Sequence, residues 1–179
     1  MSSKQLIKAA GIIALVSFLG GTIIFGWLYF SMNSEALFFG YIYVAFTVVL
    51  NLGLLVVMLV RSLGDEENKS KLQKRGLLIL VNIPIMFIYL GLTVMLLNRL
   101  RITITNSTPK EITQVKLHGC EDLSVENIKP GDSKNVWVYI PGDCSVEIEY
   151  NINGQVKTDM VAGYVTQSMG TVISYDIKP

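Results

Sequence analysis

The residue types best suited to chemistry in this 179-residue chain lie in its C-terminal half. His118, Cys120, Glu121 and Asp122 form one tight group of possible metal ligands, and a second cysteine, Cys144, follows. A structural metal site would need a second paired ligand motif, which the sequence lacks. Two cysteines in one small domain instead predict a disulfide between Cys120 and Cys144. We expect no metal and no other cofactor.

Other polar residues in this half are better explained by structure than by catalysis. Glu147 and Glu149 alternate with apolar residues and therefore share one face of a strand, but no partner acid, histidine or pocket accompanies them. Trp137 lies in a strand-like segment, where core packing explains it. Asn106 opens an Asn-Ser-Thr pattern that accepts N-glycans only in a eukaryotic secretory setting. The sequence predicts no catalytic site, and the protein is expected not to be an enzyme.

Three long apolar segments occupy the first hundred residues and must position everything else. They predict transmembrane helices at about residues 9–30, 36–60 and 76–98, each long enough to cross a hydrocarbon core of roughly 30 Å. A cleaved secretory signal is the alternative for the first segment. That segment is about twice as long as a signal core, and no small-residue cleavage pattern follows it. We therefore expect a three-helix region over 1–100 in contact with the lipid bilayer.

The few polar or small residues inside these segments predict helix packing. Asn51 lies near the middle of the second helix and Asn82 about one turn closer to the inner surface on the third, so we expect their amides to hydrogen-bond, with a gain of about 0.6 kcal/mol. Small residues recur at helical spacing on the first helix. No charged residue lies within the helical segments, and a transport pathway inside this chain alone is therefore not expected. The predicted packing residues are Ala10, Ala14, Ser17, Gly21, Asn51 and Asn82.

The distribution of basic residues predicts the orientation in the membrane. Cytoplasmic loops collect Lys and Arg close to helix ends. The N-terminus and a loop at 61–75 are therefore predicted to be cytoplasmic, and the C-terminal region extracytoplasmic, as in a bacterial inner membrane with a periplasmic domain. Arg99 and Arg101 lie on the wrong side of this rule, but they are outnumbered. The residues that set the orientation are Lys4, Lys8, Arg61, Lys69, Lys71, Lys74 and Arg75.

The segment 101–179 has the pattern of a small β domain. Seven short runs rich in β-branched and aromatic residues are separated by turn signals, of which Asn153-Gly154 is the strongest hairpin signal. This pattern predicts an immunoglobulin-like antiparallel β-sandwich of about seven strands, with a barrel as the lesser alternative. From residue 102 onward the chain carries six lysines and ten acidic residues. A nucleic-acid partner is therefore not expected, because binding phosphate requires clustered positive charge.

Together these features favour a non-enzymatic membrane subunit. The helices would dock into a larger envelope complex with other membrane proteins, and the external domain would make protein contacts. The alternative is a sensor or regulator whose external domain signals through the helices to the segment 61–75. An embedded enzyme or transporter is the least favoured class, because it needs polar catalytic or ion-binding groups at depth. Whether a small molecule binds is not indicated by the sequence.

Overall fold

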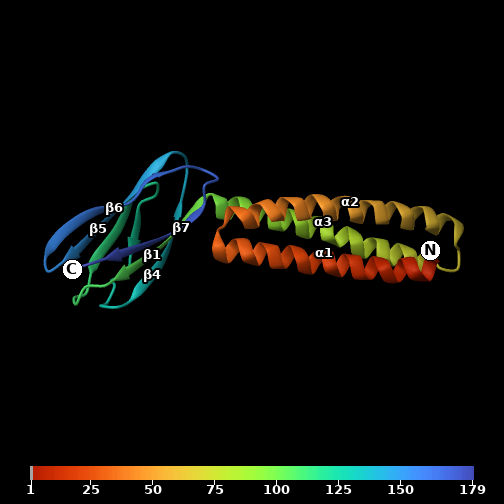
Figure 1. The fold of residues 1–179 in the computed structure, drawn as a ribbon, viewed down its shortest axis with the longest axis horizontal. Coiled ribbons are helices and arrows are strands. Elements are labelled where there is room, and N and C mark those ends of the chain that lie inside the picture. The colour runs from red at the N-terminus through yellow and green to blue at the C-terminus, as the bar shows by residue number, and fades with distance from the viewer. Residues whose placement is uncertain (1) are drawn as a thin grey trace. The chain divides into compact units, whose positions relative to one another are not determined.

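A computed structural model describes residues 2–179, which form two compact units that divide between residues 93 and 94. The first unit is helical and the second contains all seven strands (Figure 1). Three helices long and apolar enough to cross a membrane are present, as predicted, and they indicate an integral membrane protein.

The helices are α1 (Ser3–Ser31), α2 (Ser34–Gly64) and α3 (Lys69–Leu97). Ser2 begins α1 with a capping box, in which its hydroxyl accepts the Gln5 N–H and the Gln5 side chain accepts the Ser2 N–H. Asn33 caps α2 by accepting the Glu35 N–H at 2.8 Å. The connection between α1 and α2 is therefore only two residues long, which makes these helices an antiparallel pair.

The predicted loop at 61–75 is mostly helix, which corrects the sequence analysis. Residues 61–64 belong to α2, residues 69–75 belong to α3, and only 65–68 connect them. Lysine, arginine, glutamine and leucine are good helix formers, so each apolar helix continues into its charged flank. A helix of 29 or 31 residues is about 45 Å long, which exceeds the hydrocarbon core and leaves both ends in water.

The β unit consists of two sheets. One contains three strands in the order β4-β1-β7, and the other contains four in the order β3-β2-β5-β6. The strands are β1 (Arg99–Asn106), β2 (Thr113–Gly119), β3 (Leu123–Val125), β4 (Ser133–Tyr139), β5 (Cys144–Ile152), β6 (Gln155–Val165) and β7 (Thr171–Ile177).

The prediction of a fully antiparallel sandwich is wrong for one pair of strands, because β1 and β7 run parallel. A parallel pair needs a long crossover, and here the other five strands provide it. The core lies between the sheets and is filled by alternate residues of the strands. In β1, for example, Leu100, Ile102 and Ile104 are fully buried, while the residues between them are only partly buried.

The strongest local predictions in this unit are confirmed. Asn153 and Gly154 both have positive φ, 58° and 78°, and form the two-residue turn between β5 and β6 that a type I′ hairpin requires. Cys120 and Cys144 form a disulfide. Because disulfides persist in oxidising compartments, the bond indicates an extracytoplasmic location for this unit.

Candidate functional site

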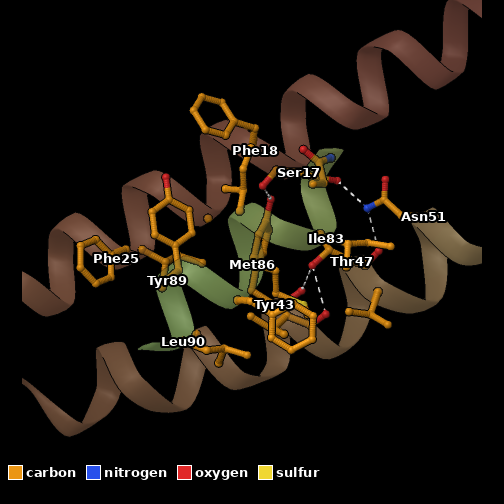
Figure 2. A pocket seen from close by; sticks show the side chains of 18 of the residues that line it. Ser17, Phe18, Phe25, Tyr43, Thr47, Asn51, Ile83, Met86, Tyr89 and Leu90 are labelled. Carbon is orange, nitrogen blue, oxygen red and sulfur yellow. Dashed lines mark hydrogen bonds between the residues drawn. The ribbon is translucent and has the colours of Figure 1, made fainter. Parts of the chain in front are cut away.

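A cavity of about 290 Å³ lies between the three helices of the first unit. Its lining is almost entirely apolar. Four of the six predicted packing residues, Ser17, Gly21, Asn51 and Asn82, are among the residues that line it. Figure 2 shows Ser17 and Asn51 in one part of the site and Phe25 and Tyr89 in another.

The two asparagine amides bond to α1 and not to each other, which corrects the expected Asn51–Asn82 pair. The Nδ2 of Asn51 donates to the Ser17 hydroxyl at 3.0 Å and to the Thr47 carbonyl at 2.8 Å. The Nδ2 of Asn82 donates to the Ala14 carbonyl at 3.1 Å. Both α2 and α3 are therefore tied to the same stretch of α1.

One hydrogen-bond acceptor beside the cavity is left without a donor. Asn51 is only 9% exposed, and its Oδ1 is buried with no hydrogen-bond partner among the described residues. Exchanging the amide oxygen and nitrogen would not help, because the Thr47 carbonyl requires a donor at the position of Nδ2. A buried, unsatisfied amide oxygen costs roughly 1–3 kcal/mol. The three helices alone therefore do not satisfy this residue.

Tyr43 was not singled out by the sequence analysis, yet it joins α2 to α1. Its hydroxyl donates to the carbonyls of Val16 and Ser17, at 2.9 and 3.2 Å. A β-carbon on Gly20 would lie 2.1 Å from this hydroxyl, so any larger residue would displace the Tyr43 ring from its present position. The adjacent glycines at 20 and 21 were the available signal, because small residues mark a close approach of another element.

Aromatic side chains line the part of the cavity farther from Asn51. The Phe25 and Tyr89 rings are stacked with their centroids 5.2 Å apart. The Tyr89 hydroxyl pairs with Thr22 at 2.6 Å, and the Thr22 hydroxyl donates to the Phe18 carbonyl. Tyr89 is therefore the donor to Thr22. These bonds hold α3 against α1 and leave apolar ring surface facing the site.

The other end of the helical unit contains a small apolar core. Ala10 and Ala14 of the predicted small-residue stripe are buried here, at 0% and 4% exposure. They pack with the buried side chains of all three helices. The remaining members of this core are Leu6, Met58, Leu72 and Ile79. This end of the bundle therefore has a buried apolar core, although Met58 and Leu72 also line a second, smaller cavity of about 140 Å³ between α2 and α3.

All seven predicted orientation residues lie at the end of the helical unit that contains this core. The start of α1 meets the α2–α3 turn, where the Ser3 hydroxyl donates to Asp65 at 2.5 Å. The hydrogen bonds from Ser3 and Asn68 lower the pKa of the Asp65 carboxyl. The orientation residues flank this contact in the first turns of α1, the last turn of α2 and the first turns of α3, and they are Lys4, Lys8, Arg61, Lys69, Lys71, Lys74 and Arg75.

Comparison of the chain with known protein families, curated proteins and solved structures finds no match.

The predicted alternatives in the β unit have structural roles. The disulfide removes Cys120 from the possible metal-ligand group, and His118 pairs with Asp122 at 3.0 Å. Asn106 is fully buried, and its Nδ2 donates to two backbone carbonyls. A glycan on this nitrogen would break these hydrogen bonds and does not fit the folded β unit. The expected core packing of Trp137 is wrong, because Trp137 lies opposite Arg101 on the outer face of its sheet. The guanidinium of Arg101 lies 4.4 Å from the centre of the Trp137 ring, in a cation–π contact.

The chemistry that the cavity supports is the binding of apolar, uncharged groups. No Asp, Glu, Lys, Arg or His is among the residues that line it in the described part of the chain. An engineered apolar cavity of about 150 Å³ holds one benzene molecule, so this one can take about two aromatic rings or a short aliphatic chain. It is too small for a whole helix, which is about 10 Å across.

Proposed function

We propose that the protein is a membrane subunit whose three helices pack against a transmembrane helix of another protein. The observation that carries this proposal is the open cavity with the unsatisfied Asn51 oxygen beside it. Two large apolar side chains of a partner helix would fill the cavity. A neighbouring Ser, Thr or Asn of that helix would donate to Asn51 after a small rotation of its amide.

The external β unit extends this proposal. In the favoured arrangement it is an immunoglobulin-like domain that makes protein contacts outside the cytoplasm. The disulfide joins Cys120, the residue after β2, to Cys144 at the start of β5, and these two strands are neighbours in one sheet. In antibody domains the bond instead joins the two sheets. The immunoglobulin-like assignment therefore rests on the two-sheet arrangement and not on the position of the disulfide.

The cavity can be tested with two neighbouring substitutions in α2. Val48 lines the cavity, whereas Val49 does not and is 73% exposed. Val48→Phe would fill part of the space that the partner needs, and Val49→Phe would add the same ring on the lipid side. After mild solubilisation of the tagged chain from its own cells, we expect Val48→Phe to reduce the co-purified partner about tenfold and Val49→Phe to leave it unchanged.

A photo-reactive leucine at position 52, which lines the cavity and keeps the size of the natural side chain, identifies what occupies the site. Cross-linking to a transmembrane segment of the co-purified protein would support the proposal. Cross-linking to lipid alone, with a chain that purifies without stoichiometric partners, would overturn it and assign the cavity to an acyl or isoprenoid chain. Equal losses of partner in both phenylalanine variants would also contradict a role for the cavity.

The proposed orientation is tested separately by cysteine labelling, in which the disulfide keeps the natural cysteines from reacting. Both natural cysteines are bonded, so a single new cysteine is the only free thiol. Ser70, in α3, and Ser133, in β4, are both exposed. In intact cells we expect a membrane-impermeant thiol reagent to label Ser133→Cys and not Ser70→Cys until the membrane is opened. Labelling of Ser70→Cys from outside would reverse the orientation.

A further inference from the structure

The free edge of β6 is the longest unpaired strand edge among the described residues. β6 ends the four-stranded sheet, is 11 residues long and pairs only with β5. Every residue from 155 to 160 is exposed, including Val156 at 62% and Met160 at 49%. A long exposed edge with apolar side chains is a template for pairing with another strand.

The hairpin fixes which backbone groups of β6 face this edge. Pairs in an antiparallel ladder alternate between hydrogen-bonded and non-hydrogen-bonded, and the pair flanking a two-residue turn is hydrogen-bonded. Counting from the Asn153–Gly154 turn, the backbone groups of Val156, Thr158 and Met160 point away from β5. The Met160 N–H is consistent with this assignment, because it donates to the Asp159 side chain at 2.8 Å and not to a carbonyl of β5.

The charged side chains of β6 restrict what can pair with it. Lys157 and Asp159 lie opposite Tyr150 and Ile148 of β5, whose side chains are buried in the core. Both charges therefore lie on the inner face of the sheet, at its edge. Inward-pointing charges on an edge strand disfavour an unrelated partner strand, which would leave them unpaired. A suitable partner must present an acid opposite Lys157 and a base opposite Asp159.

We propose that this partner is a second copy of the chain, paired antiparallel through β6 with Lys157 of each copy opposite Asp159 of the other. In this register Thr158 lies opposite Thr158 of the second copy, and Val156 lies opposite its Met160. All three residues have outward-facing backbone groups, so the ladder is complete. Shifting the register by one pair in either direction would place Lys157 opposite Lys157, or Asp159 opposite Asp159, and would bring like charges together.

Pairing exchanges contacts that Asp159 makes in the single chain. Its carboxylate accepts from the Tyr175 hydroxyl and from the Met160 N–H. In the pair, the Met160 N–H donates to the second copy's Val156 carbonyl, and the Oδ1 of Asp159 that it leaves is free to accept from Lys157 of that copy, while Oδ2 still accepts from Tyr175. The paired segment is short, so the dimer is expected to depend on concentration and to be favoured by confinement in a membrane. None of this depends on the cavity between the helices.

Disulfide cross-linking of the full-length chain in membranes tests the register. Thr158 lies on the two-fold axis, where the α-carbons of a hydrogen-bonded pair are about 5.5 Å apart and a disulfide can form. We expect Thr158→Cys to give a cross-linked dimer on mild oxidation. Ser124→Cys is the matched control, because Ser124 is exposed on β3 at the opposite edge of the same sheet. Equal cross-linking at both positions, or none at 158, would overturn the proposal.

Charge reversal in the Thr158→Cys background distinguishes the proposed pairing of two β6 strands from non-specific association of exposed strand edges. Lys157→Glu and Asp159→Lys each place like charges opposite one another, and we expect each to reduce its own cross-linked dimer about tenfold. Mixing the two variants, with different tags, restores both opposite-charge pairs and should recover the mixed dimer. This recovery would also show that both variants are folded. If the mixed dimer does not exceed the homodimers, the proposed register is wrong.

Discussion

Gly119→Ala is expected to unfold the β unit or to lower its stability by about 3 to 4 kcal/mol. Gly119 ends β2 with φ of +114°, which L-residues rarely adopt. A β-carbon there would also lie 2.0 Å from the Ser145 carbonyl oxygen. That oxygen belongs to the backbone and accepts the Cys120 N–H at 3.1 Å, so it cannot move away without disturbing the neighbouring strand and the disulfide.

Tryptophan fluorescence can follow this unfolding in the full-length chain. The sequence contains two tryptophans, Trp27 in α1 and Trp137 in β4, so Trp27→Phe leaves a reporter only in the β unit. A loss of stability of this size should lower the thermal unfolding midpoint of the β unit by on the order of 15 °C. Gly142→Ala is the control, because a β-carbon there meets nothing within 4 Å and φ is not positive. Similar unfolding midpoints for Gly119→Ala and Gly142→Ala would show that position 119 has no special requirement for glycine.

The features that the sequence predicted correctly are those encoded locally. Long uncharged runs specify helices that can cross a membrane, and alternation of apolar and polar residues specifies strands. The Asn153–Gly154 turn and the Cys120–Cys144 disulfide were likewise recoverable, because two residues with positive φ and a single pair of cysteines leave few choices. In each case the information lies within one short stretch or one residue type.

The features that were missed depend on contacts between distant segments. The parallel pairing of β1 with β7 joins the two ends of the β unit, and neither strand carries a local sign of its direction. The depth of Asn51 and Asn82 along their helices was predictable, but not the rotation of the helices that turns both amides toward α1. Likewise, the role of Tyr43 in joining α2 to α1 depends on Gly20 lying next to its hydroxyl, which the sequence alone does not show.

The candidate site was predicted only in part for the same reason. Periodicity identified residues that line the cavity but could not show that the helices leave space between them. Small residues let α1 contact Met58 and Leu72 in the apolar core, whereas the stacked rings of Phe25 and Tyr89 lie between α1 and α3 beside the cavity. Such a difference along one bundle arises from side-chain volumes on three helices at once.

Removing the disulfide is expected to be the second large effect on the β unit. The bond closes a loop with a sequence separation of 24, and restricting the unfolded chain in this way contributes about 3.5 kcal/mol. Cys120 is 8% exposed and belongs to the apolar core. Replacing both cysteines with alanine is therefore preferable to serine, which would add two hydroxyls that need hydrogen-bond partners.

The Cys120→Ala/Cys144→Ala double variant should unfold on the order of 15 to 25 °C below the parent, both measured by Trp137 fluorescence in the Trp27→Phe background. Reducing the parent with a phosphine should reproduce most of this decrease, whereas the double variant should not respond to the reductant. The helical signal in far-ultraviolet circular dichroism should persist through the transition, because the bond lies wholly within the β unit. A decrease of only a few degrees would mean that the two-sheet core, with β1 buried between β4 and β7, determines the stability without the covalent link.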